Sequence, residues 1–220
     1  MTDPNAVPTP AAEGPAVHPI EVESYRIIGE RIDLDRWPPL TRAVVSRVVH
    51  ASADVSFAET LVLAEETCAA IVRALRAGAP VVSDVEMVAV ASKRAGTVSL
   101  VGEGRGRAAR DRPAGEPDLT ISAAAMREAA DRWPTGAVLV VGNAPTALYE
   151  AIDLAARGRF GPVAVIGLPV GFVGAADSKA ALRSSGLPAI SNVGERGGSA
   201  VAAAALNALW RLAQDQTVVV

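Results

Sequence analysis

The sequence predicts a three-layer α/β/α fold built on a mainly parallel, doubly wound sheet of about five strands. Short apolar runs alternate with helical patterns along the chain, which is typical of parallel strands joined by helices. These runs are almost wholly apolar, as expected for strands buried on both faces. The chain has 220 residues, of which 50% are hydrophobic. We therefore expect a single α/β domain over residues 20–215 that follows a disordered extension over residues 1–19.

Composition excludes several classes of protein. The formal net charge is −3 and no basic run is present, so a nucleic-acid partner is not expected. The single cysteine, Cys68, rules out a disulfide framework and a thiolate metal cluster, and its helical context indicates a small buried apolar group. No apolar run is long enough to span a bilayer, and the proline-rich start resembles neither a signal nor a transit peptide. We expect a cytoplasmic protein without a membrane partner.

The first elements are predicted from helical periodicity. An amphipathic segment over residues 19–28 precedes a break at Trp37-Pro38-Pro39, and Thr41 is expected to cap a helix over residues 42–51. At about 100° per residue, four valines share one face, which predicts the buried side of that helix: Val44, Val45, Val48 and Val49. Ser46, Arg47 and His50 fall on the opposite face. A long helix over residues 57–77 should end at Gly78.

The remaining chain alternates between strands and helices. Strands are expected over residues 79–83, 97–101, 137–142, 162–167 and 188–193. Helices are expected from Asp84, from Thr120 or Ser122 to Trp133, from Asn143, from Ala175 and over residues 200–213. The segment from Gly102 to Pro117 is rich in Gly, Arg and acidic residues, which predicts a mobile loop.

Four turns between strands and helices carry small or polar residues: Ser83-Asp84, Gly142-Asn143, Gly167 to Gly174, and Gly197-Gly198-Ser199. In a parallel sheet these turns lie at one edge, where glycines and helix N-termini favour anions. The dinucleotide fingerprint and the P-loop are absent. The turns suit a large ligand with several carboxylates, although a tight turn without a ligand, or capping alone for Asp84, would give the same pattern.

His50 is the main candidate for proton transfer. The only other histidine, His18, belongs to the predicted extension. A histidine titrates near neutrality and can serve as an acid or base, whereas a lone histidine cannot form a zinc site. On an outward face, His50 is either a solvated surface residue or a functional one covered by a ligand or another subunit.

The sequence resembles the precorrin-8X methylmutase family over roughly residues 19–213. Six separated motifs carry the resemblance in the family's order: Ser24-Tyr25-Arg26-Ile27-Ile28, Arg47-Val48-Val49-His50-Ala51, Gly78 to Val88 (GAPVVSDVEMV), Gly142-Asn143-Ala144-Pro145-Thr146-Ala147-Leu148, Leu168 to Ala176 (LPVGFVGAA) and Arg196-Gly197-Gly198-Ser199. The resemblance implies a homodimeric isomerase of cobalamin biosynthesis. Such an enzyme moves a methyl group from carbon 11 to carbon 12 of a corrinoid ring without a cofactor or metal, giving hydrogenobyrinate, or cobyrinate from the cobalt form.

The resemblance also implies roles for residues of this chain. His50 would be the acid/base residue, Ser24 and Arg47 would contact the substrate, and the site would lie near the subunit interface. The turns add further candidates for substrate binding: Asp84, Asn143, Gly171, Gly174, Gly197, Gly198 and Ser199.

Two departures from the family pattern concern carboxylate recognition. Ile121 stands where the family usually has an arginine, and Glu195 stands where a basic residue is common. A loop arginine could substitute: Arg105, Arg107 or Arg110. Two other functions stay open, a diverged corrinoid-binding or carrier protein without turnover and an unrelated nucleotide-dependent α/β enzyme. The choice between a metal-free and a cobalt-containing substrate also stays open.

Overall fold

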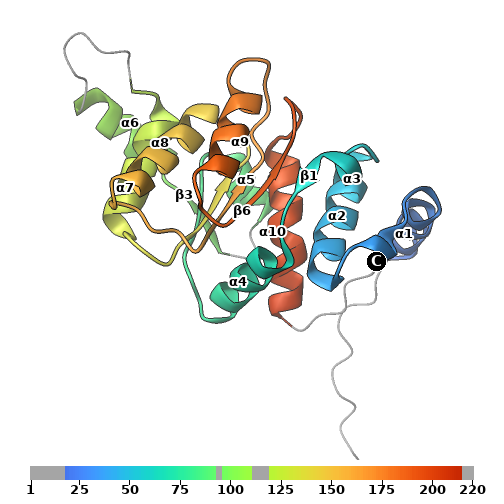
Figure 1. Cartoon of the computed structure of the whole chain (residues 1–220). Helices are drawn as coiled ribbons and strands as arrows, with labels where there is room; N and C mark the ends of the chain where they lie inside the picture. Colours follow the sequence, from blue (N-terminus) through green and yellow to red (C-terminus); the bar gives the residue numbers. More distant parts are fainter. Residues whose placement is uncertain (1–17, 93–95, 111–118, 215–220) are drawn as a thin grey trace, which may run out of the picture.

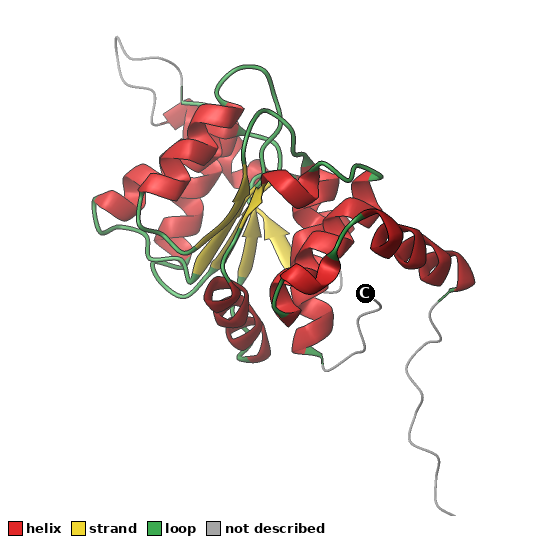
Figure 2. Ribbon diagram, turned by 45° about the vertical axis from the view of Figure 1, so that its right-hand side comes forward, coloured by secondary structure: helices red, strands yellow, loops and turns green. Residues whose placement is uncertain are grey.

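A computed structural model describes residues 18–92, 96–110 and 119–214, and its centre is a sheet with helices on both faces (Figure 2). In the described part of the chain the sheet has six strands in the order β1-β6-β5-β4-β2-β3. The strands are β1 (Leu61–Val62), β2 (Val81–Ser83), β3 (Thr97–Ser99), β4 (Val138–Val141), β5 (Ala164–Gly167) and β6 (Ala189–Asn192). β2 to β6 pair in parallel, whereas the edge strand β1 pairs antiparallel with β6. The predicted fold class is confirmed, with one short antiparallel strand added.

The helices form the two outer layers. They are α1 (Pro19–Arg31), the 3₁₀ helix η1 (Leu34–Arg36), α2 (Pro39–Ser52), α3 (Phe57–Thr60), α4 (Glu65–Arg76), α5 (Glu86–Ala91), α6 (Val101–Arg110), α7 (Ile121–Arg132), α8 (Pro145–Ala156), α9 (Ala175–Ser184) and α10 (Ser199–Ala213). On one face α10 packs against the sheet, α2 packs on α10, and α1 packs on α2. α1 is therefore the outermost helix of this layer (Figure 1). The opposite face carries α7, α8 and α9, with α6 packed on α7.

The strands are buried on both faces because their successive side chains enter two different cores. Val138 and Val140 of β4 belong to the core beneath α10 and α2, whereas Leu139 and Val141 belong to the core beneath α7 and α8. The valine face predicted for α2 is also buried in the first core. Periodicity alone thus predicted these contacts correctly.

Gly142 allows α10 to approach the end of β4 closely. A Cβ at this position would lie 2.8 Å from the Cα of Ser199, the first residue of α10. A backbone atom cannot move aside as a flexible side chain can, so this contact requires glycine. Gly142 therefore fixes where α10 crosses the sheet.

The prediction of one long helix over residues 57–77 is wrong. The chain forms α3, then β1, then α4, because Leu61 and Val62 pair with Asn192 and Ser191 of β6. A strand partner far along the sequence outweighed a continuous helical pattern. Gly78 does follow α4 with a positive φ of 77°, as expected for a residue that ends a helix.

The prediction of a mobile loop over residues 102–117 is also wrong for the part of this segment that the structure describes. Residues 101–110 form α6, and residues 111–117 lie outside the described residues. A Cβ at Gly104 would lie 2.5 Å from the carbonyl oxygen of Ile121 and 2.7 Å from the backbone nitrogen of Ala125. The glycine that argued against a helix is therefore what lets α6 pack closely on α7.

Two predicted helix starts need correction. α2 begins at Pro39, and Thr41 lies inside its first turn. Glu65 of α4 caps α2 instead, since it accepts hydrogen bonds from the N–H of Leu40 at 3.0 Å and of Thr41 at 2.8 Å. His18 is not part of a structureless extension. It is the N-cap of α1, and its Nδ1 accepts a hydrogen bond from the N–H of Ile20 at 3.2 Å. Residues 1–17 and 215–220 lie outside the described residues.

Candidate active site

A cavity of about 520 Å³ lies between α1 and the C-terminal end of α2. We call it the His50 cavity, and its lining residues are Pro19, Ile20, Glu23, Ser24, Ile27, Ile28, Arg31, Val49, His50, Ala53 and Val55. Most of the wall is apolar. Its polar groups come from α1 and from His50 in the last turn of α2. A concave apolar site with a few polar groups is the usual form of a small-molecule site.

Ser24 and Tyr25 of α1 fix the orientation of His50. Ser24 Oγ lies 2.8 Å from His50 Nδ1, and the Tyr25 ring stacks on the imidazole at 5.0 Å between centroids with 17° between planes. Among the described residues, the structure shows no hydrogen-bond partner for the other ring nitrogen, Nε2. The ring is thus held from one side, and Nε2 is free to exchange a proton with a bound molecule.

An ion-pair cluster lies next to the histidine. Glu21 Oε1 accepts hydrogen bonds from Arg47 Nη1 at 2.7 Å and from Arg211 Nη1 at 3.0 Å. Arg47 Nη1 also donates to the Tyr25 hydroxyl at 3.2 Å. Burial acts to raise the pKa of Glu21, but the two arginines outweigh it, and this pKa lies below its ordinary value. Glu21 is therefore ionised at neutral pH and joins α1 to α2 and α10.

The pKa of His50 is lowered from its ordinary value of 6.5. Burial is the largest cause, the positive charge of Arg47 is the next, and Glu21 opposes both. A neighbouring positive charge lowers the pKa of a histidine because it disfavours the protonated imidazole. Free His50 is consequently a neutral imidazole at neutral pH. An anionic ligand would favour its protonated form.

The surface that covers the outward face of α2 is α1 of the same chain. The sequence left a ligand or another subunit open as this covering surface, and its helical periodicity placed Ser46 outside the core. Ser46 is in fact fully buried, and its hydroxyl donates to the carbonyl oxygen of Ala43 at 3.3 Å. α2 lies between α1 and α10, so both of its faces are covered within the chain.

The sequence suggested that Asp84 caps the helix that follows it, but the structure shows a different role. Asp84 is fully buried and accepts three backbone hydrogen bonds from the turn that follows β4. The donors are the N–H groups of Gly142 at 2.9 Å, Asn143 at 2.8 Å and Ala144 at 2.7 Å. Burial raises the pKa of Asp84, although these bonds oppose the shift. The strand order reverses between β2 and β4, which is where this fold usually binds its ligand. At this place Asp84 bonds to the protein backbone instead.

The glycine-rich turns at the same edge are also bonded to each other. The N–H of Gly198 donates to the carbonyl oxygen of Leu168 at 2.8 Å, and the N–H of Gly171 donates to that of Glu195 at 3.1 Å. These two amides are therefore used inside the protein. Gly174 and Ser199 lie at the N-terminal ends of α9 and α10, outside the wall of the His50 cavity.

Lys179 of α9 supports the last of these turns. It is fully buried, and its Nζ donates to Asn192 Oδ1 at 3.0 Å and to the carbonyl oxygen of Arg196 at 2.6 Å. Burial, reinforced by the charge of Arg183, lowers the pKa of Lys179 to about 8. The Arg196 side chain contacts Asp54 and Ser56, which flank Val55 of the cavity wall. Through Arg196 the turn thus contacts the segment that carries Val55 of the cavity wall.

The arginines proposed as substitutes at Ile121 lie elsewhere. Arg107 of α6 pairs with Asp131 at 2.5 Å and Glu128 at 3.5 Å. α6 and α7, including Ile121, belong to the layer on the opposite face of the sheet from α1 and α2. Arg105 belongs to the same helix, and nothing is described for the side chain of Arg110. Within one chain this region does not meet the His50 cavity.

Comparison with known proteins decides the family. The family model described as precorrin-8X methylmutase matches residues 19–212. The chain belongs to this family. It is 38% identical over 198 residues to the cobalt-precorrin-8 methylmutase of Methanothermobacter thermautotrophicus, with 89% of this chain and 93% of the relative covered. It is 38% identical over 196 residues to the precorrin-8X methylmutase of Sinorhizobium sp, with 86% and 91% covered.

A solved structure supports the same assignment. The precorrin-8X methylmutase of Thermus thermophilus matches with a TM-score of 0.79 and 34% identity, covering 89% of this chain and 96% of that one. As a member of the methylmutase family the protein is an isomerase, which confirms the class that the motifs predicted. In the described part of the chain, no helix has the length and apolar character needed to cross a membrane.

Sequence reasoning missed several residues around the predicted site of this methylmutase-family member. Glu21 was visible only as part of an amphipathic segment, and Tyr25 only as part of a family motif without a role of its own. Arg211 lies 190 residues from the Glu21 that it contacts. The i, i+4 spacing of Glu21 and Tyr25 was the available signal, because it places both on one helix face. Nothing in the local pattern around Lys179 indicated a buried cation.

Proposed function

We propose that this chain catalyses methyl migration from carbon 11 to carbon 12 of the corrin ring of precorrin-8 in cobalamin biosynthesis, with His50 as acid and base. The observation that carries the proposal is the Ser24–His50 pair in the wall of an apolar cavity. The family match supports the reaction class, because the relatives are named as methylmutases for precorrin-8X or cobalt-precorrin-8.

The proposed reaction is an isomerisation, so the substrate and the product contain the same atoms. The methyl group leaves carbon 11 and bonds to carbon 12 of the same ring. Imidazolium Nε2 of His50 lends a proton to the conjugated ring system and recovers it when the new bond has formed. Ser24 holds Nδ1, so the ring cannot turn away during this exchange.

The free and bound states of His50 differ in charge under this proposal. Burial and Arg47 keep the free imidazole neutral. Peripheral carboxylates of the substrate bring negative charge to the cavity, which raises the pKa and supplies the acid when substrate is present. Ser24, in the cavity wall, and Arg47, about one helical turn before His50 on α2, would contact the substrate. Asp84, Asn143, Gly171, Gly174, Gly197, Gly198 and Ser199 would shape the neighbouring edge.

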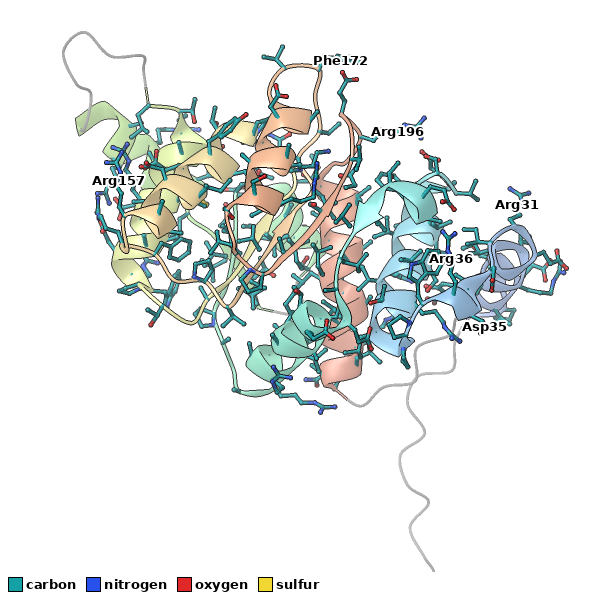
Figure 3. The ribbon with its side chains drawn as sticks, viewed as in Figure 1. Arg31, Asp35, Arg36, Arg157, Phe172 and Arg196 are labelled. Atoms are coloured by element: carbon teal, nitrogen blue, oxygen red, sulfur yellow. The ribbon has the colours of Figure 1, made fainter. Side chains whose placement is uncertain are left out.

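A homodimer in the cytoplasm completes the proposal. Phe172 and Val173 of the loop between β5 and α9 are 91% and 90% exposed, and such apolar side chains are typical of a covered surface. Their loop lies at the upper edge of the molecule in Figure 3, near Arg196. Analytical ultracentrifugation at micromolar concentration should show a dimer, and an active monomer would contradict this part.

The activity is tested by adding the protein to precorrin-8X and, separately, to its cobalt form while the visible spectrum is recorded. Product formation with repeated turnover is expected, and the preferred substrate shows which form this enzyme uses. A spectrum that changes only in proportion to the protein added would indicate a corrinoid-binding protein without turnover and would overturn the proposal. A thermal-shift screen with nucleotides should show no stabilisation.

A further inference from the structure

Three charged or titratable side chains line the His50 cavity among the described residues: Glu23, Arg31 and His50. Glu23 is already compensated, since its carboxylate accepts hydrogen bonds from Arg26 Nε at 2.9 Å and Nη2 at 2.8 Å. His50 is neutral in the free protein. Arg31 is the charged side chain of the cavity wall for which the described part of the chain provides no partner.

Arg31 belongs to the last turn of α1 and is exposed. In the described ranges the structure shows no ion pair or hydrogen bond of its guanidinium, and the acidic residues near it in the sequence are engaged elsewhere. Glu30 contacts Arg26, and Asp35 pairs with Arg42 at 3.0 Å. Asp33 accepts a hydrogen bond from the N–H of Asp35 at 3.1 Å. Figure 3 shows Arg31 projecting outward from α1, apart from Asp35.

An unpaired guanidinium at the rim of an apolar cavity suits a ligand with an apolar body and an anionic edge. Walls made by Ile20, Ile27 and Val49 can cover a ring system. The guanidinium presents a planar fork of N–H donors that matches a carboxylate in two parallel hydrogen bonds. Because no acid of the described chain competes for it, Arg31 binds such a carboxylate without first breaking an internal ion pair.

We infer that Arg31 is a specificity residue that binds one peripheral carboxylate of the corrinoid while its ring enters the cavity toward His50. This inference rests on the proposed function, because the ligand class comes from it. Arg31 acts on affinity and not on the proton transfer, since it belongs to the end of α1, seven residues after the Ser24 that holds the imidazole.

The test compares binding of cobyrinic acid and of its heptamethyl ester, titrated by visible spectroscopy. The variants are Arg31→Gln, Arg31→Lys and, as a control, Arg157→Gln. Arg157 pairs with Asp153 of its own helix and lies at the far end of the molecule (Figure 3). Its substitution changes net charge by the same amount without touching the cavity.

Arg31→Gln should raise the Kd for cobyrinic acid roughly tenfold, since one charge-assisted contact is lost. Arg31→Lys should recover part of the affinity, and Arg157→Gln should leave it unchanged. The ester should bind wild type and Arg31→Gln equally. In turnover, KM should rise while kcat stays within about threefold.

Unchanged affinity for the acid, or an equal loss for acid and ester, would overturn the role of Arg31. A wild-type protein that binds the acid in an Arg31-dependent way without converting precorrin-8X or its cobalt form would overturn the proposed function and leave this inference standing. A wild-type protein that binds neither compound would overturn both.

Discussion

The carboxyl edge of the sheet and the His50 cavity carry similar polar residues but use them differently. At the edge, Asp84 and Lys179 are fully buried, and backbone or side-chain groups of the protein bond to both. In the cavity, His50 is half-buried with its Nδ1 bonded to Ser24, and Arg31 is exposed at the rim. The polar groups at the edge therefore already bond to the protein and hold the fold together, whereas the cavity has polar groups that a ligand can reach.

This difference separates stability from activity. A buried polar group that loses its partner costs free energy of unfolding, because water cannot replace the missing bond. A half-buried group in a cavity costs little when removed but takes its chemistry with it. Substitutions at the edge should therefore act mainly on stability, and substitutions in the cavity mainly on turnover or binding.

The largest effect is expected for His50→Ala. General acid–base catalysis typically contributes about 10²–10⁴-fold in rate, and no other described residue of the cavity wall is a histidine. Single-turnover rates should fall by that factor, whereas corrinoid affinity and Tm should change little. Turnover within threefold of wild type would show that His50 is not the acid.

Asp84→Asn should destabilise the fold without acting on the chemistry directly. An amide in place of the carboxylate would direct N–H donors at backbone N–H groups of the Gly142–Ala144 turn, which already donate there. A loss of about 3 kcal/mol is expected, or a Tm lower by roughly 6–12 °C. Asp153→Asn, on the solvent-facing side of α8, is the control. An unchanged Tm with lost binding would instead assign Asp84 to the ligand.

Gly197→Ala and Gly194→Ala form a matched pair within one turn. Both glycines have positive φ, of 157° and 89°. A Cβ at Gly197 would lie 2.3 Å from the carbonyl oxygen of Leu168, whereas a Cβ at Gly194 would meet nothing within 4 Å. Chemical denaturation should show Gly197→Ala less stable than Gly194→Ala by about 2 kcal/mol. Equal stabilities would mean that the turn at Leu168 yields easily.

The pH dependence should show the smallest effect. Imidazolium is the proposed acid, so kcat/KM should fall as pH rises through the pKa of free His50, which lies below 6.5. The pH profile of kcat should fall at a higher pH than that of kcat/KM, because the carboxylates of the bound substrate raise the pKa of His50. Rates measured over the pH range in which wild type is folded give both profiles. Coincident profiles would show that the substrate does not change the charge state of His50.

The sequence by itself determined the layers of the fold and the identity of the candidate acid. Alternating apolar runs predicted the five parallel strands, and the spacing of Val44, Val45, Val48 and Val49 predicted the buried face of α2. These features depend on side chains a few residues apart, so periodicity reveals them. The motifs around Ser24 and His50 predicted the family, which the comparison confirmed.

Only the tertiary structure decided which distant segments meet. β1 exists because Leu61 pairs with Asn192, and Asp84 is buried because it bonds to a turn 58 residues away. α1 covers His50 because Glu21 binds Arg47 and Arg211 from two other helices. In each case a contact between residues far apart in the sequence offsets the free-energy cost of burying or ordering them. A local sequence pattern contains no information about such a contact. Among the described residues, the same physics leaves Arg31 without an ion pair at the cavity rim, because the acids nearest to it in sequence are bound elsewhere.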